Sequence, residues 1–335
     1  MARHSIPDII ERAEPREARG SAPARPLGMS LVRSLRPAQW TKNLIIFGPL
    51  LLGQRLRDGV YVGTLLDGQA VLYSIAAFAI FCALSGVVYL LNDVADREAD
   101  ARHPIKRFRP IASGAVPVST ALATAIALGT VALGAAFWLR PAFGLLGAGY
   151  LGLLAVYSGP LKHVVIIDVL TIAVGFVLRA AAGAVVINVA ISHWLLILTI
   201  LLALFLALSK RRHELVLLAD DATSHRRILQ EYSPYLLDQM ISVVTASTLL
   251  AYAFYTVSPE TIQKFGSDRL VWTLPFPLYG IFRYLYLVHQ KEGGGSPAEM
   301  LVTDRPLLVC VAVWVIVLAL IIYWSQIPLL KGLIG

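Results

Sequence analysis

The polar stretch at residues 89–114 holds the side chains best suited to chemistry. If it begins as the end of a helix, Asn92, Asp96 and Asp100 are spaced i, i+4 and i+8, and Asp93 lies one step away. The carboxylates and the amide should therefore share one face. Oxygen ligands of this kind bind hard cations. The spacing predicts a Mg²⁺ site.

Bases follow these acids, on a segment that Pro104 and Pro110 should keep as a loop. Lys106, Arg107 and Arg109 could share the charge of a phosphate with the cation. The pattern therefore suits a magnesium–diphosphate. The alternative is a solvated, salt-bridged helix end, but so many acids beside so many bases exceed what solubility requires.

The rest of the chain must position these groups in a membrane. It has 335 residues, of which 57% are hydrophobic and 15% charged, and a mean hydropathy of +0.69. Apolar stretches of about 20 residues, enough to cross a bilayer as helices, recur throughout. We expect an all-α polytopic membrane protein. The net charge of +8 lies mainly between apolar runs, which indicates membrane topology and no nucleic-acid partner.

Nine apolar runs predict nine transmembrane helices in one catalytic domain, residues 31–335, with a polar cavity facing the cytoplasm. The predicted spans are 40–56, 71–91, 118–139, 143–157, 164–188, 191–209, 240–257, 270–288 and 306–325. Residues 1–30 lack an apolar signal segment and are expected to form a disordered cytoplasmic tail. The loops after the second, fourth, sixth and eighth runs hold most bases, which places the site on the cytoplasmic side of a plasma (inner) membrane.

Two ionisable residues fall inside the fifth run. Asp168 and Arg179 would each cost several kcal/mol in lipid unless paired or hydrated, so both are functional candidates. Eleven residues of helix separate them, which is about 16 Å and too far for an ion pair. Either each finds a partner on another helix, or both line one polar cavity. We expect the cavity.

Further bases lie where apolar runs meet water. Lys162 and the pair Lys210 and Arg211 are either membrane anchors or a second set of phosphate ligands that faces the first. Lys42 is open to the same two interpretations. Tyr89 precedes Asn92 by three residues, about one helical turn, and could line the same pocket. The sequence has no zinc-protease HExxH, no serine-hydrolase GxSxG and no Walker-type loop.

These motifs resemble those of a known family. Asn92-Asp-x-x-Asp96-x-x-x-Asp100, with Arg109-Pro-x-x-x-Gly114, looks like the first Asp-rich motif of the UbiA superfamily of intramembrane prenyltransferases. Four stretches resemble the decaprenyl-phosphate phosphoribosyltransferase branch. They are Arg36-Pro-x-Gln-Trp-x-Lys-Asn43, the segment 103–114, Tyr157-x-x-x-Leu-Lys-His163 with Asp168 and Arg179, and the segment 231–235.

The resemblance implies a UbiA-like helical bundle and a substrate. Where aromatic prenyltransferases carry a second Asp-rich motif, this chain has Lys210-Arg-Arg-His-Glu214. That departure favours phosphoribosyl diphosphate as donor and a polyprenyl (decaprenyl-type) phosphate as acceptor. The product, polyprenyl-phosphoryl-5-phosphoribose, would feed arabinose donors for cell-wall glycans.

The resemblance also assigns roles to residues. The catalytic group would be Asp93, Asp96, Asp100 and Asp168. Mg²⁺ would be held by Asn92, Asp96, Asp93 and Asp100. The substrate- and phosphate-binding group would be Lys42, Tyr89, Lys106, Arg107, Arg109, Lys162, Arg179, Lys210 and Arg211.

Two other functions stay open. An aromatic or quinone prenyltransferase shares the metal motif but uses a polyprenyl diphosphate as donor. A membrane transporter would explain the helices and the intramembrane Asp168 and Arg179, but not acids concentrated at one helix end. The sequence gives neither the lipid chain length nor the oligomeric state, and a homo-oligomer is compatible with it.

Overall fold

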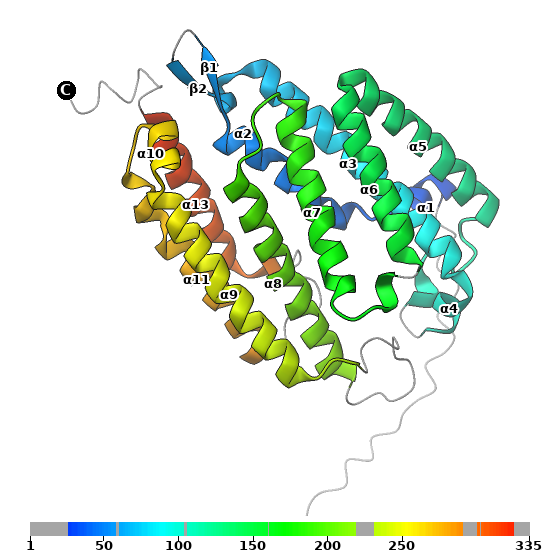
Figure 1. Ribbon diagram of the computed structural model, residues 1–335. Coiled ribbons are helices and arrows are strands. Elements are labelled where there is room, and N and C mark those ends of the chain that lie inside the picture. The colour runs from blue at the N-terminus through cyan, green and yellow to red at the C-terminus, as the bar shows by residue number, and fades with distance from the viewer. Residues whose placement is uncertain are drawn as a thin grey trace, which may run out of the picture.

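The structure is a computed structural model that describes residues 26–57, 60–103, 106–159, 161–218, 231–290, 300–301 and 303–324. The described chain is almost entirely helical (Figure 1). Its long helices are α3 (Gly68–Ala95), α5 (Val118–Leu139), α6 (Pro141–Ser158), α7 (Ile167–Val186), α8 (His193–Leu218), α9 (Pro234–Val257), α11 (Pro275–Gln290) and α13 (Arg305–Tyr323). The helical fold class is confirmed.

Short elements join these helices. The α-helical ones are α1 (Leu27–Ser34), α2 (Gly48–Leu52), α4 (Arg97–Arg102) and α10 (Pro259–Phe265). The 3-10 helices are η1 (Pro37–Phe47), η2 (Thr64–Leu66), η3 (Lys106–Phe108), η4 (Leu161–His163) and η6 (Arg269–Thr273). One antiparallel hairpin, β1 (Gln54–Arg57) with β2 (Val60–Gly63), pairs Gln54 with Gly63. This hairpin was not predicted from the sequence.

Seven of the described helices are long and apolar enough to cross a membrane: α3, α5, α6, α7, α8, α9 and α13. The expected count of nine is therefore not confirmed. The expected first span, 40–56, is divided between η1, α2 and β1. The expected eighth span becomes η6 and the 16-residue α11, which is about 24 Å long.

Helix boundaries follow ordinary capping chemistry. The Asp67 carboxylate accepts a hydrogen bond from the Gln69 backbone N–H at 3.0 Å and begins α3. Ser233 and Asp304 begin α9 and α13 in the same way. The sixth apolar run does not end at residue 209 as expected, because α8 continues to Leu218 and carries the basic residues with it. At the N-terminus, α1 begins at Leu27, inside the range expected to be a tail, and residues 1–25 lie outside the described residues.

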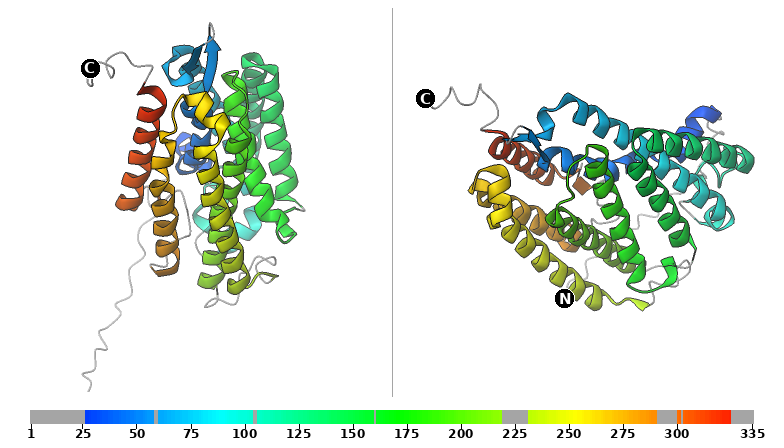
Figure 2. Two further views of the ribbon diagram at one scale, coloured as in Figure 1. Left: turned by 60° about the vertical axis from the view of Figure 1, so that its left-hand side comes forward. Right: turned by 45° about the horizontal axis from the view of Figure 1, so that its top comes forward.

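The long helices pack in chain order, each against the next (Figures 1 and 2). The N-terminal elements η1 and α2 pack against α3 and α7 in the interior. The last helix meets them: the Tyr323 hydroxyl bonds the Leu50 and Leu51 carbonyl oxygens at 3.3 and 3.0 Å. The two ends of the chain therefore close one bundle.

A close helix contact holds η1 against α7. Gly183 lies against the backbone of Ile46, and a Cβ atom there would overlap the Ile46 carbonyl oxygen. Only glycine permits this approach. It seats the segment that carries Lys42 and Asn43 directly on the helix that carries Arg179.

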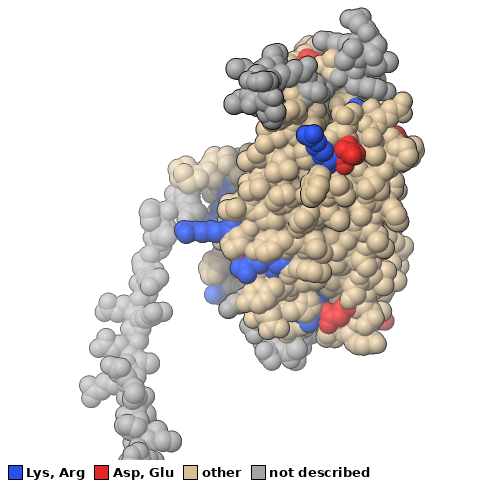
Figure 3. Space-filling model, turned by 90° about the vertical axis from the view of Figure 1, so that its left-hand side faces the viewer, with Lys and Arg blue, Asp and Glu red and all other residues tan. Residues whose placement is uncertain are grey.

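The outer surface of the bundle is largely apolar. One lateral face is almost uncharged, with acids and bases gathered toward its ends and along one side (Figure 3). Elsewhere, Ile126 and Val131 of α5 are 69% and 70% exposed, and Trp138 at its end is 85% exposed. Apolar side chains of this size, exposed along a helix of membrane-spanning length, suit contact with lipid.

Candidate active site

The acids of residues 92–100 do not form one continuous helical face. α3 ends at Ala95 and α4 begins at Arg97, so the helix is interrupted at Asp96, although 2.8 Å backbone hydrogen bonds still join Asp96 to Asn92 and Asp100 to Asp96. Asp96 is exposed and Asp100 is buried. Asp93 and Asp100 are buried, and both accept hydrogen bonds from Arg109 Nη1, at 3.2 and 2.5 Å. The structure thus brings these two acids together on a guanidinium.

Arg36 completes this cluster from the N-terminal side. Its guanidinium forms an ion pair with Asp93 and stacks 4.8 Å from the centre of the Tyr89 ring. Arg36 has a left-handed backbone with φ of 53°, which turns the chain from α1 into η1. Asp93 therefore carries two arginines, and its burial is balanced by two positive charges.

Asn92 faces the end of α6, and Asp96 faces solvent. Asn92 Oδ1 accepts a hydrogen bond from the Ser158 hydroxyl at 2.6 Å, and the Asp96 side chain is exposed. Across the described ranges, no group of three or more acids, histidines or cysteines could hold a metal ion. A cation that arrives with a phosphate needs fewer protein ligands, because Mg²⁺ commonly keeps one or two carboxylates plus substrate oxygens. Asn92 and Asp96 fit that smaller requirement.

The loop bases occupy two short 3-10 helices. Lys106 and Arg107 lie on η3, where the Arg107 guanidinium stacks 4.9 Å from the centre of the Phe108 ring. Lys162 lies half-buried on η4, between α6 and α7. Of the predicted loop bases, Arg109 is bonded to Asp93 and Asp100.

Asp168 is fully buried and pairs with α8. Its Oδ2 accepts from Arg211 Nε at 2.9 Å, and its Oδ1 accepts from the Tyr232 hydroxyl at 2.9 Å. Arg211 also donates to Glu214 at 2.7 Å. Tyr232 in turn accepts from the Ile166 backbone N–H at 2.7 Å. This cluster joins α7, α8 and the segment before α9.

The Tyr232 hydroxyl stays protonated in this setting. Burial, together with the adjacent Asp168 carboxylate, raises the pKa of Tyr232 to about 12. The hydroxyl therefore remains a donor to Asp168 at all physiological pH values. Asp168 is left with two donors on its two oxygens, which suits a carboxylate that holds its neighbours in place.

Arg179 is buried in the centre of the bundle and held by neutral groups. It donates to Asn43 Oδ1 at 2.7 Å, to the Tyr150 hydroxyl at 2.6 Å and to the Gly175 carbonyl at 3.0 Å. Its guanidinium also stacks 4.6 Å from the Tyr150 ring centre. These three neutral partners orient the cation without neutralising it. Asp168 and Arg179 each have partners on other elements, which is the alternative to the shared polar cavity that was expected.

Several cations act on one another around Lys42. The charges of Lys210, Arg179 and Arg36 all act on the Lys42 ammonium, although they come from α8, α7 and the α1–η1 turn. We call these four residues the basic centre. Arg36 is paired with Asp93 and Lys210 with Glu214 at 3.7 Å, so these two charges are partly neutralised, whereas Arg179 donates to the neutral Asn43 and Tyr150. A bound anion would offset the repulsion that remains between the four cations.

The end of α6 connects the two halves of the site. Ser158 bonds Asn92 of the acidic segment, and the neighbouring Tyr157 hydroxyl accepts from Arg211 Nη2 at 3.4 Å. α6 therefore contacts both groups of residues predicted from the sequence. It contacts the segment 89–114 through Asn92 and the second set of bases through Arg211.

Several residues of the site had no role in the sequence prediction, among them Arg36, Asn43, Ser158 and Tyr232. Arg36 and Asn43 bound the Arg-Pro-x-Gln-Trp-x-Lys-Asn stretch, so a signal for them was present. Tyr232 lies in the segment 231–235, which also resembled the family, whereas Ser158 shows its role only through its contact with Asn92, 66 residues earlier.

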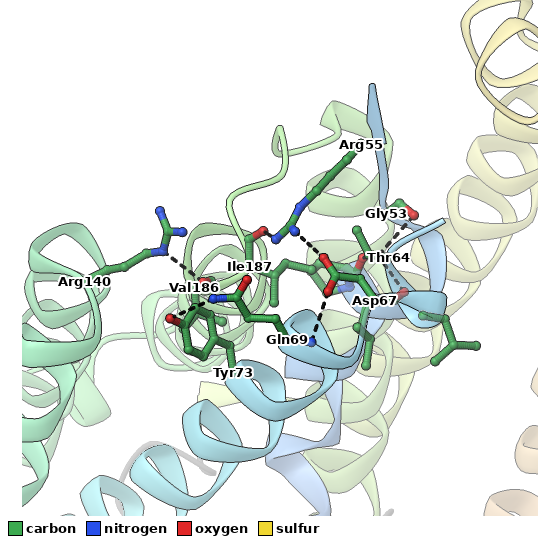
Figure 4. A network of polar contacts seen from close by, with 12 residues as sticks. Gly53, Arg55, Thr64, Asp67, Gln69, Tyr73, Arg140, Val186 and Ile187 are labelled. Carbon is green, nitrogen blue, oxygen red and sulfur yellow. Dashed lines mark hydrogen bonds and ion pairs between the residues drawn. The ribbon is translucent and has the colours of Figure 1, made fainter. Parts of the chain in front are cut away.

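At the opposite end of the bundle, two arginines hold α7 in place (Figure 4). Arg140 Nε donates to the Val186 carbonyl at 3.0 Å. Arg55 of the hairpin donates to the Ile187 carbonyl and pairs with Asp67 at 2.5 Å. Cations at the last carbonyls of a helix satisfy acceptors that have no partner within it. These contacts fix the axial position of the helix that carries Asp168 and Arg179.

Comparison with known proteins accounts for this fold. A sequence model of the UbiA prenyltransferase family matches residues 59–303. The decaprenyl-phosphate phosphoribosyltransferase of Corynebacterium glutamicum is 32% identical over 310 residues, which cover 90% of this chain and 89% of the relative. The protein of that name from Mycobacterium tuberculosis is 32% identical over 296 residues, covering 88% and 94%.

A solved structure shares the architecture. A UbiA homologue from Archaeoglobus fulgidus bound to GPP and Mg²⁺ aligns with a TM-score of 0.65 at 18% identity, over 88% of this chain and 99% of the other. The structural likeness supports the fold, and the sequence match covers most of the chain. The protein therefore belongs to the UbiA prenyltransferase family.

Proposed function

We propose that this protein transfers a 5-phosphoribosyl group from phosphoribosyl diphosphate to a polyprenyl phosphate and releases diphosphate. The observation that carries the proposal is the basic centre of Lys42, Lys210, Arg179 and Arg36. Both substrates bring phosphate groups, and a phosphoribosyl donor brings one more than a prenyl diphosphate does. The names of the two relatives, which match almost the whole chain, support the same reaction.

The donor diphosphate would lie at the end of α3. Asn92 and Asp96 would hold Mg²⁺ there, and the ion would neutralise charge that develops on the leaving diphosphate. Asp93 and Asp100 are assigned as positioning residues, because both are already bonded to Arg109. Their role is to aim the Arg36 and Arg109 guanidinium groups at the diphosphate.

The chemical step needs little proton transfer. The bond from the anomeric carbon to the diphosphate oxygen breaks, and a new bond forms from that carbon to an oxygen of the acceptor phosphate. The acceptor is anionic at neutral pH, so it attacks without a general base. Catalysis then rests on holding two phosphorylated substrates together against their repulsion. We assign Lys42, Arg179 and Lys210 to that task.

The remaining predicted residues take supporting roles in this proposal. Asp168 positions Arg211 and, through it, the α8 segment that carries Lys210. Tyr89 lines the donor pocket beside Arg36. Lys106, Arg107 and Lys162 bind substrate phosphates from the loops. We place this end of the bundle in the cytoplasm, because the loops at this end hold most of the bases.

Activity of the purified protein in nanodiscs tests the proposal. Radiolabelled phosphoribosyl diphosphate, decaprenyl phosphate and Mg²⁺ should give a labelled lipid on thin-layer chromatography and release diphosphate. Omitting Mg²⁺, or adding EDTA, should abolish both signals. A parallel reaction should contain a polyprenyl diphosphate and an aromatic acid acceptor. Turnover in that reaction, with none on phosphoribosyl diphosphate, would replace the proposal with the aromatic prenyltransferase.

A further inference from the structure

In the short helix α1 the buried and exposed faces are the reverse of those on a helix at a water-facing surface. Its small polar residues Ser30 and Ser34 are buried, at 4% and 1% exposed. Its outward face carries Met29 and Val32, which are 59% and 53% exposed. An amphipathic helix on a water-facing surface turns its apolar stripe to the core and its polar side outward. The reversed arrangement indicates an apolar surrounding.

The depth of α1 matches the edge of a bilayer. α1 packs against α3 (Figures 1 and 2), where Leu31 and Leu35 join a cluster around Val87 and Leu90. Those residues lie in the last turns of the membrane-spanning part of α3. The boundary between lipid and water must fall close by, because the charged segment begins directly beyond them.

The charge on α1 fits the same surrounding. Arg33 is exposed and follows Val32, so a cation lies beside the apolar face. Helices that lie in a membrane interface bury apolar side chains among the acyl chains and direct Lys or Arg toward anionic headgroups. At the same level of α3, Leu91 is 44% exposed, so the span itself presents an apolar side chain there.

We propose that α1 is an interfacial helix that binds the surface of the bilayer, with Met29 and Val32 in lipid and Arg33 at headgroup phosphates. The occupant of its outward face is lipid. The consequence for the fold is local: α1 ends two residues before Arg36, so the membrane surface fixes the entry of the chain into the bundle. This inference does not depend on the reaction.

Site-directed spin labelling tests the apolar part of the proposal. In a background with Cys82→Ala and Cys310→Ala, a nitroxide is placed by Met29→Cys or Val32→Cys in the full chain, in phosphatidylcholine nanodiscs containing some phosphatidylglycerol. Collision with O₂, which partitions into lipid, is compared with collision with a water-soluble nickel chelate. Glu98→Cys, on exposed α4, is the aqueous control, and Val131→Cys is the lipid control.

We expect the O₂-to-nickel ratio at Met29 and Val32 to exceed that at Glu98 severalfold and to approach that at Val131. Two label positions keep the test valid if one variant folds poorly. A ratio equal to the Glu98 value would place the face in water. Low collision with both reagents would show cover by protein, from residues 1–25 or a second copy. Either result overturns the proposal.

The charged part has its own test. Raising the phosphatidylglycerol fraction should lower nickel collision at Met29, because anionic headgroups draw Arg33 and the helix toward the membrane. Arg33→Gln should remove that dependence. Arg97→Gln, on α4, is the matched control and should retain it. A dependence that survives Arg33→Gln would exclude the headgroup contact.

Discussion

The buried pair Asp168–Arg211 allows a quantitative test of the site. The Asp168 side chain is 0% and the Arg211 side chain 4% exposed, with Nε and Oδ2 2.9 Å apart. Removing one partner of such a pair leaves a buried charge unpaired and commonly costs about 3–5 kcal/mol. Asp168→Asn keeps an acceptor for Tyr232, and Arg211 keeps Glu214, so we expect a loss at the low end, about 3 kcal/mol.

The next ion pair on the same helix is a matched control. Arg212 contacts Asp238 at 2.5 Å, but their side chains are 17% and 37% exposed. A pair of this exposure should contribute about 0–1 kcal/mol. Asp238→Asn should therefore change the free energy of unfolding by no more than about 1 kcal/mol.

A double-mutant cycle measures the coupling. The variants Asp168→Asn, Arg211→Met and both together are unfolded reversibly by SDS titration in mixed micelles. We expect the double variant to cost less than the sum of the singles by at least about 1.5 kcal/mol, since a charged hydrogen bond is counted twice in that sum. A coupling below about 0.5 kcal/mol, or an Asp168→Asn loss no larger than that of Asp238→Asn, would refute the buried pair.

Three further predictions concern single positions. Asp96→Asn should reduce Mg²⁺-dependent turnover by about 100-fold or more. Its thermal midpoint should be nearly unchanged, because the Asp96 side chain is exposed. Retained turnover would show that Asp96 does not hold the metal. Gly183→Ala should lower the free energy of unfolding by about 1–3 kcal/mol, because the new Cβ atom would overlap the Ile46 carbonyl oxygen. Gly134→Ala on α5, where a Cβ atom would meet open space, should not destabilise the protein. Equal thermal midpoints for the two variants would contradict the Gly183–Ile46 contact. The pKa of Tyr232 is about 12 in the folded protein and about 10 when unfolded, so between pH 10 and pH 12 unfolding releases its proton. The free energy of unfolding should therefore fall as the pH rises through this range, and should fall less steeply in Tyr232→Phe. Unfolding measured as a function of pH tests this, and equal slopes would contradict it.

Sequence reasoning found the elements that local composition determines. The run 118–139 forms α5 over the same residues, and the fifth run forms α7 with Asp168 and Arg179 inside it. Such assignments succeed because hydropathy over about 20 residues decides whether a helix can enter a bilayer. The division of residues 37–57 and 60–63 into η1, α2 and a hairpin was not predictable in this way. η1 and α2 pack against α3 and α7, and the hairpin lies at one end of the bundle (Figure 1).

The sequence alone determined that this chain spans a membrane many times and gathers acids and bases at one end, because hydropathy and charge are properties of each residue. Only the tertiary structure decided which charges meet. Asp93 and Asp100 were expected to face a metal, yet both are bonded to Arg109, and Arg36 reaches Asp93 from 57 residues away. Arg179 takes its acceptor from Asn43, 136 residues earlier. A buried charge must find a partner nearby in space, and helix packing, which no local spacing encodes, selects that partner.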